Sequence, residues 1–245
     1  MNPFYYFGKY LLLLKNTFSK PEKLGLYGHR LITEMNSIGV NSLGIVIMIS
    51  VFMGAVTTVQ TAYQLTAGLI SNSVIGSVVS QSTILELSPS ITSLVLAGRV
   101  GSSIASEIGT MKVTEQVDAL EVMGINSASF LILPKIIAAV IMIPLLVIIS
   151  IFLSISGGIL AGHLTGIVSY QDFVEGLRNS FEVYTLVFSL IKAFSFAFVI
   201  SSVSAYQGYY TNGGALEVGQ SSTKAVVVSC LMILFMDYLL AQLFL

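Results

Sequence analysis

This 245-residue chain places ionisable side chains inside otherwise apolar runs, among them Glu86, Lys192 and Asp237. A charge placed in hydrocarbon costs roughly 2.5–3.5 kcal/mol on insertion scales, so each of these side chains needs a partner or water. A lysine held between two carboxylates would satisfy all three groups. The pattern fits a structural ion-pair cluster that fixes helix packing. It equally fits the polar floor of a cavity or a coupling switch, and the residues leave both interpretations open.

Other kinds of chemistry find little support in the residues. The sequence contains no Ser/His/Asp set and no Cys/His cluster, so we predict no catalytic residue, no metal site and no enzymatic activity. It also lacks the GxxxxGK[ST] pattern that cradles nucleotide phosphates. A net charge of −1 argues against a nucleic-acid partner.

The elements that must position these residues are membrane helices. Hydrophobic residues make up 55% of the chain and charged residues only 9%, against about a quarter charged in soluble domains. A spanning helix needs about 20 mostly apolar residues. Five runs qualify, namely Ile38–Tyr63, Thr83–Ser106, Leu133–Gly162, Tyr184–Ala205 and Ala225–Leu245. We therefore predict an all-α integral membrane protein.

We predict two parts in the chain. Residues 1–37 form an N-terminal interfacial amphipathic segment, with a frayed terminus as the alternative. Residues 38–245 form a five-span domain. Within it, Asn72 to Ser82 is a small-residue elbow before the second span. The third run is long enough that it must tilt, kink at Pro144 or protrude.

Basic residues near the span ends predict the orientation. Five precede the first span: Lys9, Lys15, Lys20, Lys23 and Arg30. Arg99, Lys112 and Lys135 surround the connection between the second and third spans. Residues 67–82 carry no charge. We therefore expect a cytoplasmic N-terminus, a C-terminus outside, and a cytoplasmic second connection.

That second connection begins with small residues at every fourth position, Ala97, Gly101, Ala105 and Gly109, which favours close helix packing. It continues as a charged amphipathic helix over about residues 107–124. Val113, Val117 and Leu120 can share one face of this helix, while Lys112, Glu115, Asp118 and Glu121 stay wet. Such a helix, held between two spans, is suited to binding a soluble partner.

The central segment, LAGRVGSSIASEIGTMKVTEQVDALEVMGIN, resembles the MlaE-type permeases, and so does the LELSP that precedes it (Leu85 to Pro89). The resemblance extends through LIKA (Leu190 to Ala193), YQGYYTNGGA (Tyr206 to Ala215) and MDYLL (Met236 to Leu240). These permeases are the membrane subunits of ABC systems that move phospholipids together with MCE-domain proteins.

The resemblance implies a homodimer with two cytoplasmic ABC ATPases and a periplasmic MCE-domain protein, in a bacterial inner membrane. ATP and Mg²⁺ would bind to the ATPase, with no cofactor in this chain. The amphipathic helix would be the coupling helix, and Glu86, Lys192 and Asp237 would match a charged trio of the family. The coupling helix would contact the ATPase through Lys112, Glu115, Gln116, Asp118 and Glu121. A lipid pocket would be lined by Gln64, Leu65 and Leu69.

The chain departs from some members of this family at two positions, because Leu85 and Lys224 stand where those members carry arginine. Lysine lacks the bidentate fork of arginine, so we expect a different grip on a lipid phosphate. Two rival functions remain. One is an ion-coupled secondary transporter that uses Glu86, Lys192 and Asp237, although we see no inverted repeat. The other is a structural anchor for an assembly outside.

Overall fold

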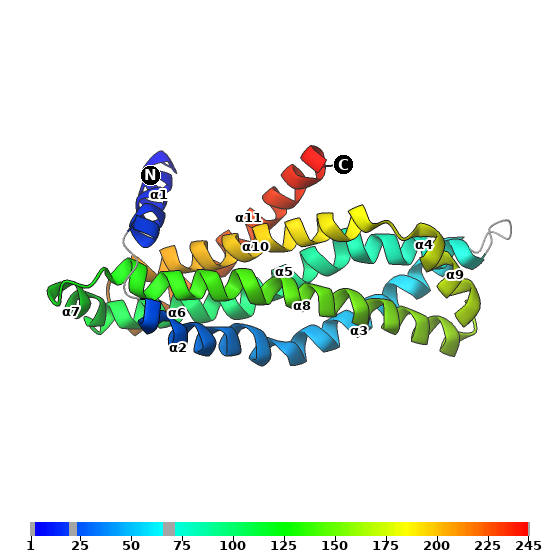
Figure 1. Cartoon of the computed structure of the whole chain (residues 1–245), viewed down its shortest axis with the longest axis horizontal. Helices are drawn as coiled ribbons and strands as arrows, with labels where there is room; N and C mark the ends of the chain where they lie inside the picture. Colours follow the sequence, from blue (N-terminus) through cyan, green and yellow to red (C-terminus); the bar gives the residue numbers. More distant parts are fainter. Residues whose placement is uncertain (1–2, 20–23, 66–71, 245) are drawn as a thin grey trace. The chain divides into compact units, whose positions relative to one another are not determined.

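The structure is a computed structural model that describes residues 3–19, 24–65 and 72–244. Within these ranges every regular element is a helix (Figure 1), as predicted. The elements, with π-helical segments written η, are α1 (Pro3–Ser19), α2 (Leu24–Met35), η1 (Asn36–Val40), α3 (Asn41–Leu65), α4 (Asn72–Ser82), η2 (Thr83–Ile91), α5 (Thr92–Leu96), η3 (Ala97–Gly101), α6 (Ser102–Val113), α7 (Gln116–Val122), α8 (Ser127–Thr165), α9 (Tyr170–Ser180), α10 (Val183–Tyr209) and α11 (Ala215–Phe244).

Four helices in the described part of the chain are long and apolar enough to cross a membrane. They are Gly28–Leu65, Ser127–Leu164, Val183–Tyr209 and Ala215–Phe244. Each contains most or all of one predicted span. The predicted second span, Thr83–Ser106, is helical throughout but divided among η2, α5, η3 and α6. Its crossing of the membrane stays a prediction.

Proline has a different effect in two of these elements. Pro89 lies within the π-helical η2, where the helix is wider than an α-helix. Proline has no N–H to donate and its ring crowds the carbonyl four residues back, which disfavours a regular α-turn. In α8, by contrast, the helix continues through Pro144 and reaches 39 residues. At about 1.5 Å per residue its length is about 58 Å, well beyond the roughly 30 Å of a bilayer core.

The helices fall into two compact units, which we describe separately. The first unit comprises Met1–Asn41, Leu94–Ile143 and Ser195–Tyr238. The second comprises Ser42–Ser93, Pro144–Phe194 and Leu239–Leu245.

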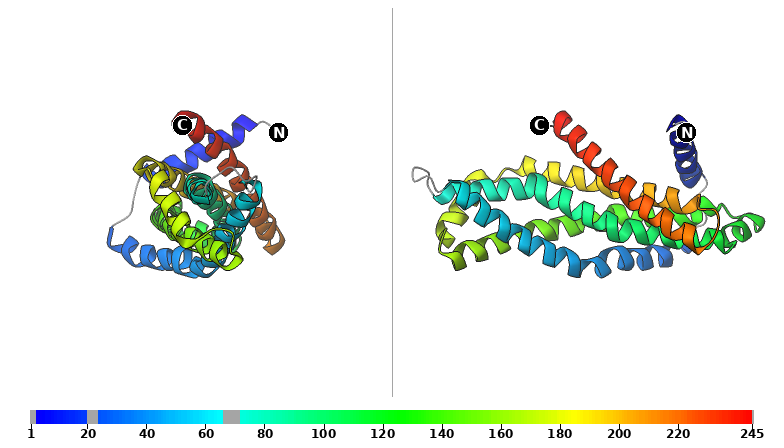
Figure 2. Two further views of the ribbon diagram at one scale, coloured as in Figure 1. Left: turned by 90° about the vertical axis from the view of Figure 1, so that its right-hand side faces the viewer. Right: turned by 180° about the vertical axis from the view of Figure 1, so that it is seen from behind.

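In the second unit, α4 and α9 lie side by side, as Figures 1 and 2 show from different directions. A Cβ added to Gly76 would meet the main chain of Phe173, and one added to Gly176 would meet that of Ser73. The Ser77 hydroxyl donates to the Gly176 carbonyl at 2.8 Å. The predicted elbow is therefore a helix, held to α9 by backbone-close packing.

Close packing also joins α3 to α8 in this unit. A Cβ on Gly54 would run into the main chain of Ser154, and one on Gly158 would lie 2.6 Å from the Thr58 hydroxyl. Gly162 faces the methyl group of the same threonine. Gly158 and Gly162, four residues apart on α8, therefore both pack closely against Thr58 of α3.

In the first unit the small-residue stripe packs against α10. A Cβ on Gly101 would lie 2.8 Å from Ser204 Oγ, and one on Gly208 would lie 2.6 Å from the Ala105 carbonyl oxygen. All four residues of the stripe are buried: Ala97, Gly101, Ala105 and Gly109. The packing interpretation of this stripe is also confirmed.

Candidate functional site

The structure pairs two of the three membrane charges within the second unit. Lys192, on α10, donates from Nζ to Glu86 Oε2 of η2 at 2.6 Å. The same ammonium donates to the Leu85 carbonyl at 3.3 Å and lies 5.1 Å from the centroid of the Phe188 ring. The ammonium is thus surrounded by a carboxylate, a carbonyl and an aromatic face, which together replace part of its hydration.

The two members of this ion pair differ in exposure. The Lys192 side chain is fully buried, whereas that of Glu86 is 54% exposed. When a membrane surrounds the protein, the exposed side of this carboxylate requires water, a polar ligand or another chain beside it. Asp237 is buried and belongs to the first unit, so its meeting with the pair stays a prediction.

The predicted amphipathic helix over residues 107–124 is divided in the structure. Helix α6 ends at Val113 and α7 begins at Gln116. Between them Glu115 has φ 62°, the only positive φ at a non-glycine residue in the described ranges. Lys112 Nζ bonds Asp118 Oδ1 at 2.5 Å across this turn. The predicted contact residues therefore flank a sharp turn and do not line one straight helix.

The amphipathic character of this region is nevertheless confirmed. Val117 is fully buried, and Asp118 has an exposed side chain. Glu115 and Gln116 are exposed as well, and the Gln116 amide donates to Thr114 Oγ1 at 3.1 Å. The wet face that the sequence predicts is present, with α7 shorter than expected.

Helix α7 is tied to other elements of the first unit at its C-terminal end. Glu121 Oε1 accepts hydrogen bonds from Ser127 Oγ at 2.8 Å and from the Tyr209 hydroxyl at 3.1 Å. The Asn126 side-chain amide donates to the Asn16 carbonyl of α1 at 3.0 Å. Glu121, predicted as a contact for the ATPase, therefore links α7 to α8 and α10.

The tip of the α7 region carries two apolar residues that the sequence analysis missed. Val122 is 89% exposed and Met123 is 65% exposed. A signal was available, because both residues follow directly on the charged face, just before the Gly124 turn. Exposed apolar side chains beside charged ones are typical of a surface that another protein covers.

The predicted lipid pocket is described only in part. Gln64 is exposed at the end of α3, and Leu65, the last residue of that helix, packs partly buried on the cluster that contains Phe173. Leu69 lies outside the described residues. An open, largely apolar hollow lies on the same helix nearby, lined by Ala55, Val56, Val59, Gln60 and Tyr63.

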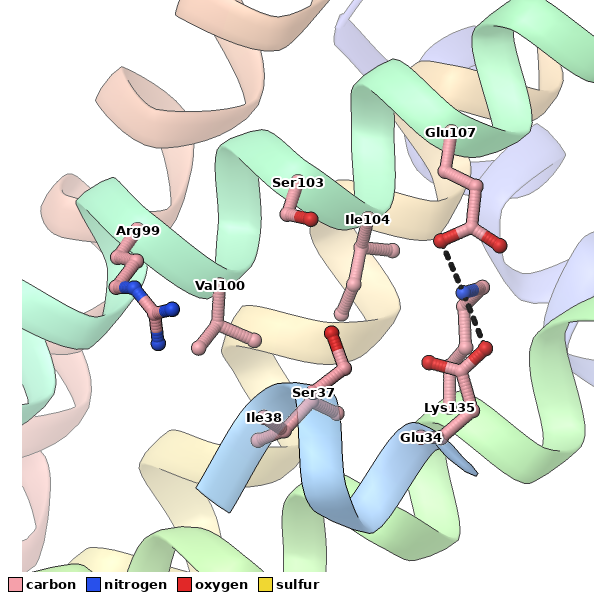
Figure 3. A pocket seen from close by; sticks show the side chains of 9 residues that line it. All are labelled: Glu34, Ser37, Ile38, Arg99, Val100, Ser103, Ile104, Glu107 and Lys135. Carbon is pink, nitrogen blue, oxygen red and sulfur yellow. Dashed lines mark hydrogen bonds and ion pairs between the residues drawn. The ribbon is translucent and has the colours of Figure 1, made fainter. Parts of the chain in front are cut away.

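The first unit also contains a polar cleft of about 90 Å³ (Figure 3). Lys135 Nζ of α8 bridges Glu34 Oε1 of α2 at 2.6 Å and Glu107 Oε2 of α6 at 2.7 Å. The lining residues are Glu34, Ser37, Ile38, Arg99, Val100, Ser103, Ile104, Glu107 and Lys135. From the sequence, Lys135 was used only to predict the orientation, although a lysine inside the predicted span Leu133–Gly162 is itself a signal of a buried polar site.

Comparison with known proteins places this helical membrane chain among transporter subunits. The family described as "Permease MlaE" matches residues 31–243. A probable ABC transporter permease protein of Rickettsia bellii is 41% identical over 219 residues, which cover 89% of this chain and 84% of that protein. A probable ABC transporter permease protein of Synechocystis is 36% identical over 86% of this chain and 80% of its own length.

A plant relative is more distant. The protein TRIGALACTOSYLDIACYLGLYCEROL 1, chloroplastic, of Arabidopsis thaliana is 35% identical over 86% of this chain and 60% of that protein. Apolar helices and these relatives together define the class, a membrane-embedded permease subunit of an ABC transporter. The chain belongs to the MlaE permease family, and an ABC permease works with an ATPase partner.

Proposed function

We propose that this permease moves phospholipids between a bacterial inner membrane and a periplasmic MCE-domain protein, as a homodimer driven by two cytoplasmic ABC ATPases. ATP and Mg²⁺ bind to the ATPases. The N-terminus is cytoplasmic, the C-terminus is periplasmic, and the region around α7 is the coupling element. The name of the plant relative refers to a galactosylated diacylglycerol lipid, which supports a lipid cargo.

The observation that carries this proposal is the α6–α7 region. It presents exposed Glu115 and Asp118 beside the apolar tip of Val122 and Met123. The rear of α7 is fixed by buried Val117 and by the bonds of Glu121. A rigidly attached element with an apolar and acidic outer face is suited to insert into a groove on a soluble subunit and to transmit its movement.

The half-exposed Glu86 supports the remaining part of the proposal. A second copy of the chain, with a lipid-filled cavity between the two copies, would place polar groups or water beside this carboxylate. Apolar pockets with few polar groups are the usual sites for acyl chains. The predicted pocket residues Gln64, Leu65 and Leu69 remain part of this proposal.

The test of the coupling role replaces Glu115 and Asp118 together with lysine, and separately replaces Met123 with arginine. Glu121 is left unchanged because it holds α7 in place. We expect both variants to lose the ATPase during affinity purification. The matched control is Glu175→Lys, an exposed acidic residue on α9. ATPase recovery equal to that of the control would contradict the coupling role.

A further inference from the structure

The cleft around Lys135 has opposite charges at its two ends (Figure 3). At one end stand Glu34 and Glu107 with Lys135 between them, so two negative charges and one positive charge leave a net charge of −1. Arg99 stands at the other end and carries +1. The cleft as a whole is neutral but strongly dipolar.

The groups at both ends differ in what they can offer a ligand. The Lys135 side chain is only 3% exposed and already bonds both carboxylates, so it fixes their position and cannot reach a ligand. The Glu107 side chain is 45% exposed and bonds Lys135 through only one of its oxygens. Exposed Ser37 and Ser103 lie along the lining between the ends. The other polar groups that line the cleft are a carboxylate oxygen, two hydroxyls and the Arg99 guanidinium, whose five N–H groups can serve more than one partner.

We infer that this cleft binds the zwitterionic headgroup of a phospholipid, an ammonium joined by a short spacer to a phosphodiester. The ammonium bonds Glu107 and the phosphodiester bonds Arg99, whose planar fork matches two phosphate oxygens. A purely anionic headgroup fits less well, because it has the same phosphodiester but no ammonium to balance the end that carries −1. This assignment is separate from the proposed lipid pocket near Leu65.

The position of the cleft in the helices supports a lipid source. Glu34 lies six residues into the apolar helix Gly28–Leu65, and Lys135 lies eight residues into Ser127–Leu164. These offsets correspond to about 9 and 12 Å of helix. Each of these helices has 38 residues, about 57 Å, so its ends extend beyond the hydrocarbon core into the headgroup layers. The cleft therefore lies at the depth of lipid headgroups.

The test measures binding of short-chain lipids to the purified full-length permease in detergent by calorimetry, without ATP. The probes are dihexanoyl phosphatidylethanolamine, dihexanoyl phosphatidylglycerol and free phosphoethanolamine. We expect the zwitterionic lipid to bind at least 10-fold more tightly than the anionic lipid and than the free headgroup. The inference rests on the proposed function only in that phospholipid reaches the chain. Because the experiment measures no transport or ATPase activity, the headgroup inference and the proposed transport function can fail independently of each other.

Three variants and one control sharpen the result. Arg99→Gln should weaken binding of both lipids at least 10-fold, and Ser103→Phe should abolish binding by filling the cleft without changing a charge. Glu107→Gln should reverse the preference towards the anionic lipid. Arg178→Gln, an exposed arginine on α9, should change nothing. Equal binding of both lipids to the wild type, or an unchanged preference in Glu107→Gln, would overturn the zwitterion assignment. Equal affinity for free phosphoethanolamine would overturn the lipid source.

Discussion

Burial is shared unequally between the two members of the Glu86–Lys192 ion pair. The lysine ammonium is fully buried and contacts the Glu86 carboxylate, the Leu85 carbonyl and the Phe188 ring. The carboxylate is open on one side, where solvent can hydrate it. Removing one partner of a buried pair is costly because it leaves an uncompensated charge behind. The cost of each single substitution therefore depends on which charge stays.

This asymmetry gives a prediction. Glu86→Leu strands a buried ammonium and should lower the free energy of unfolding by about 3 kcal/mol, near the low end for a broken buried pair. Lys192→Met strands a hydrated carboxylate and should cost about 1 kcal/mol, in the range of a more exposed pair. The double variant should be more stable than Glu86→Leu alone. Unfolding by heat or denaturant in detergent measures the stability of all three variants. Equal losses of stability in Glu86→Leu and Lys192→Met would contradict this prediction.

At the scale of elements, the chain relies on glycines where helices meet closely. Helix α3 offers a matched comparison, because Gly54 lies against the main chain of Ser154 whereas Gly44 has no neighbouring atom within 4 Å of an added Cβ. Two substitutions of the same kind, in the same helix, therefore test packing alone.

We expect Gly54→Ala to lower the unfolding temperature, with a cost of about 1–3 kcal/mol for forcing extra volume into a packed contact. Gly44→Ala should be neutral or stabilising by up to about 1 kcal/mol, because alanine favours helix over glycine. Circular dichroism during heating compares both with the wild type. A similar fall in unfolding temperature in the two variants would show that the close contact of Gly54 with α8 does not account for the loss.

Several elements were predictable from the sequence for physical reasons. Long apolar runs can bury their backbone polar groups in a membrane only as helices, so α3, α8, α10 and α11 followed directly. The spacing of small residues correctly indicated the close contact of Gly101 with α10. The break at Glu115 was not predictable, because neither glycine nor proline marks it. The Glu34–Lys135–Glu107 bridge was missed because helix periodicity does not reveal which helices become neighbours.

At the scale of the whole molecule, a single chain leaves much apolar surface and one membrane carboxylate uncovered. Exposed aromatic residues on α1, among them Phe4, Tyr5 and Phe7, suit an interfacial position. The Glu86 side chain is 54% exposed, so in a membrane its exposed side requires water or polar groups beside it. The proposed homodimer with ATPases and a lipid-filled cavity meets these requirements together.

This arrangement predicts both stoichiometry and cargo. Native mass spectrometry of the complex should show two permeases, two ATPases and bound phospholipid. Leu65→Trp should reduce the lipid count several-fold by filling the proposed pocket, while subunit stoichiometry is unchanged. Ile32→Trp, at an exposed apolar position on α2, serves as the control. A lipid-free wild-type complex would contradict the transport proposal and favour a structural anchor.

The backbone of Glu115 is in the left-handed conformation, with φ 62°. A left-handed conformation costs a side-chain-bearing residue about 1 kcal/mol, a cost that glycine avoids. We therefore expect Glu115→Gly to stabilise the isolated permease while weakening its association with the ATPase, measured by unfolding and by co-purification. Because of this turn, α6 and α7 do not continue as one helix. In the proposed complex, sideways motion of α7 would turn α6, so the permease would respond to rotation of its ATPases as well as to their approach.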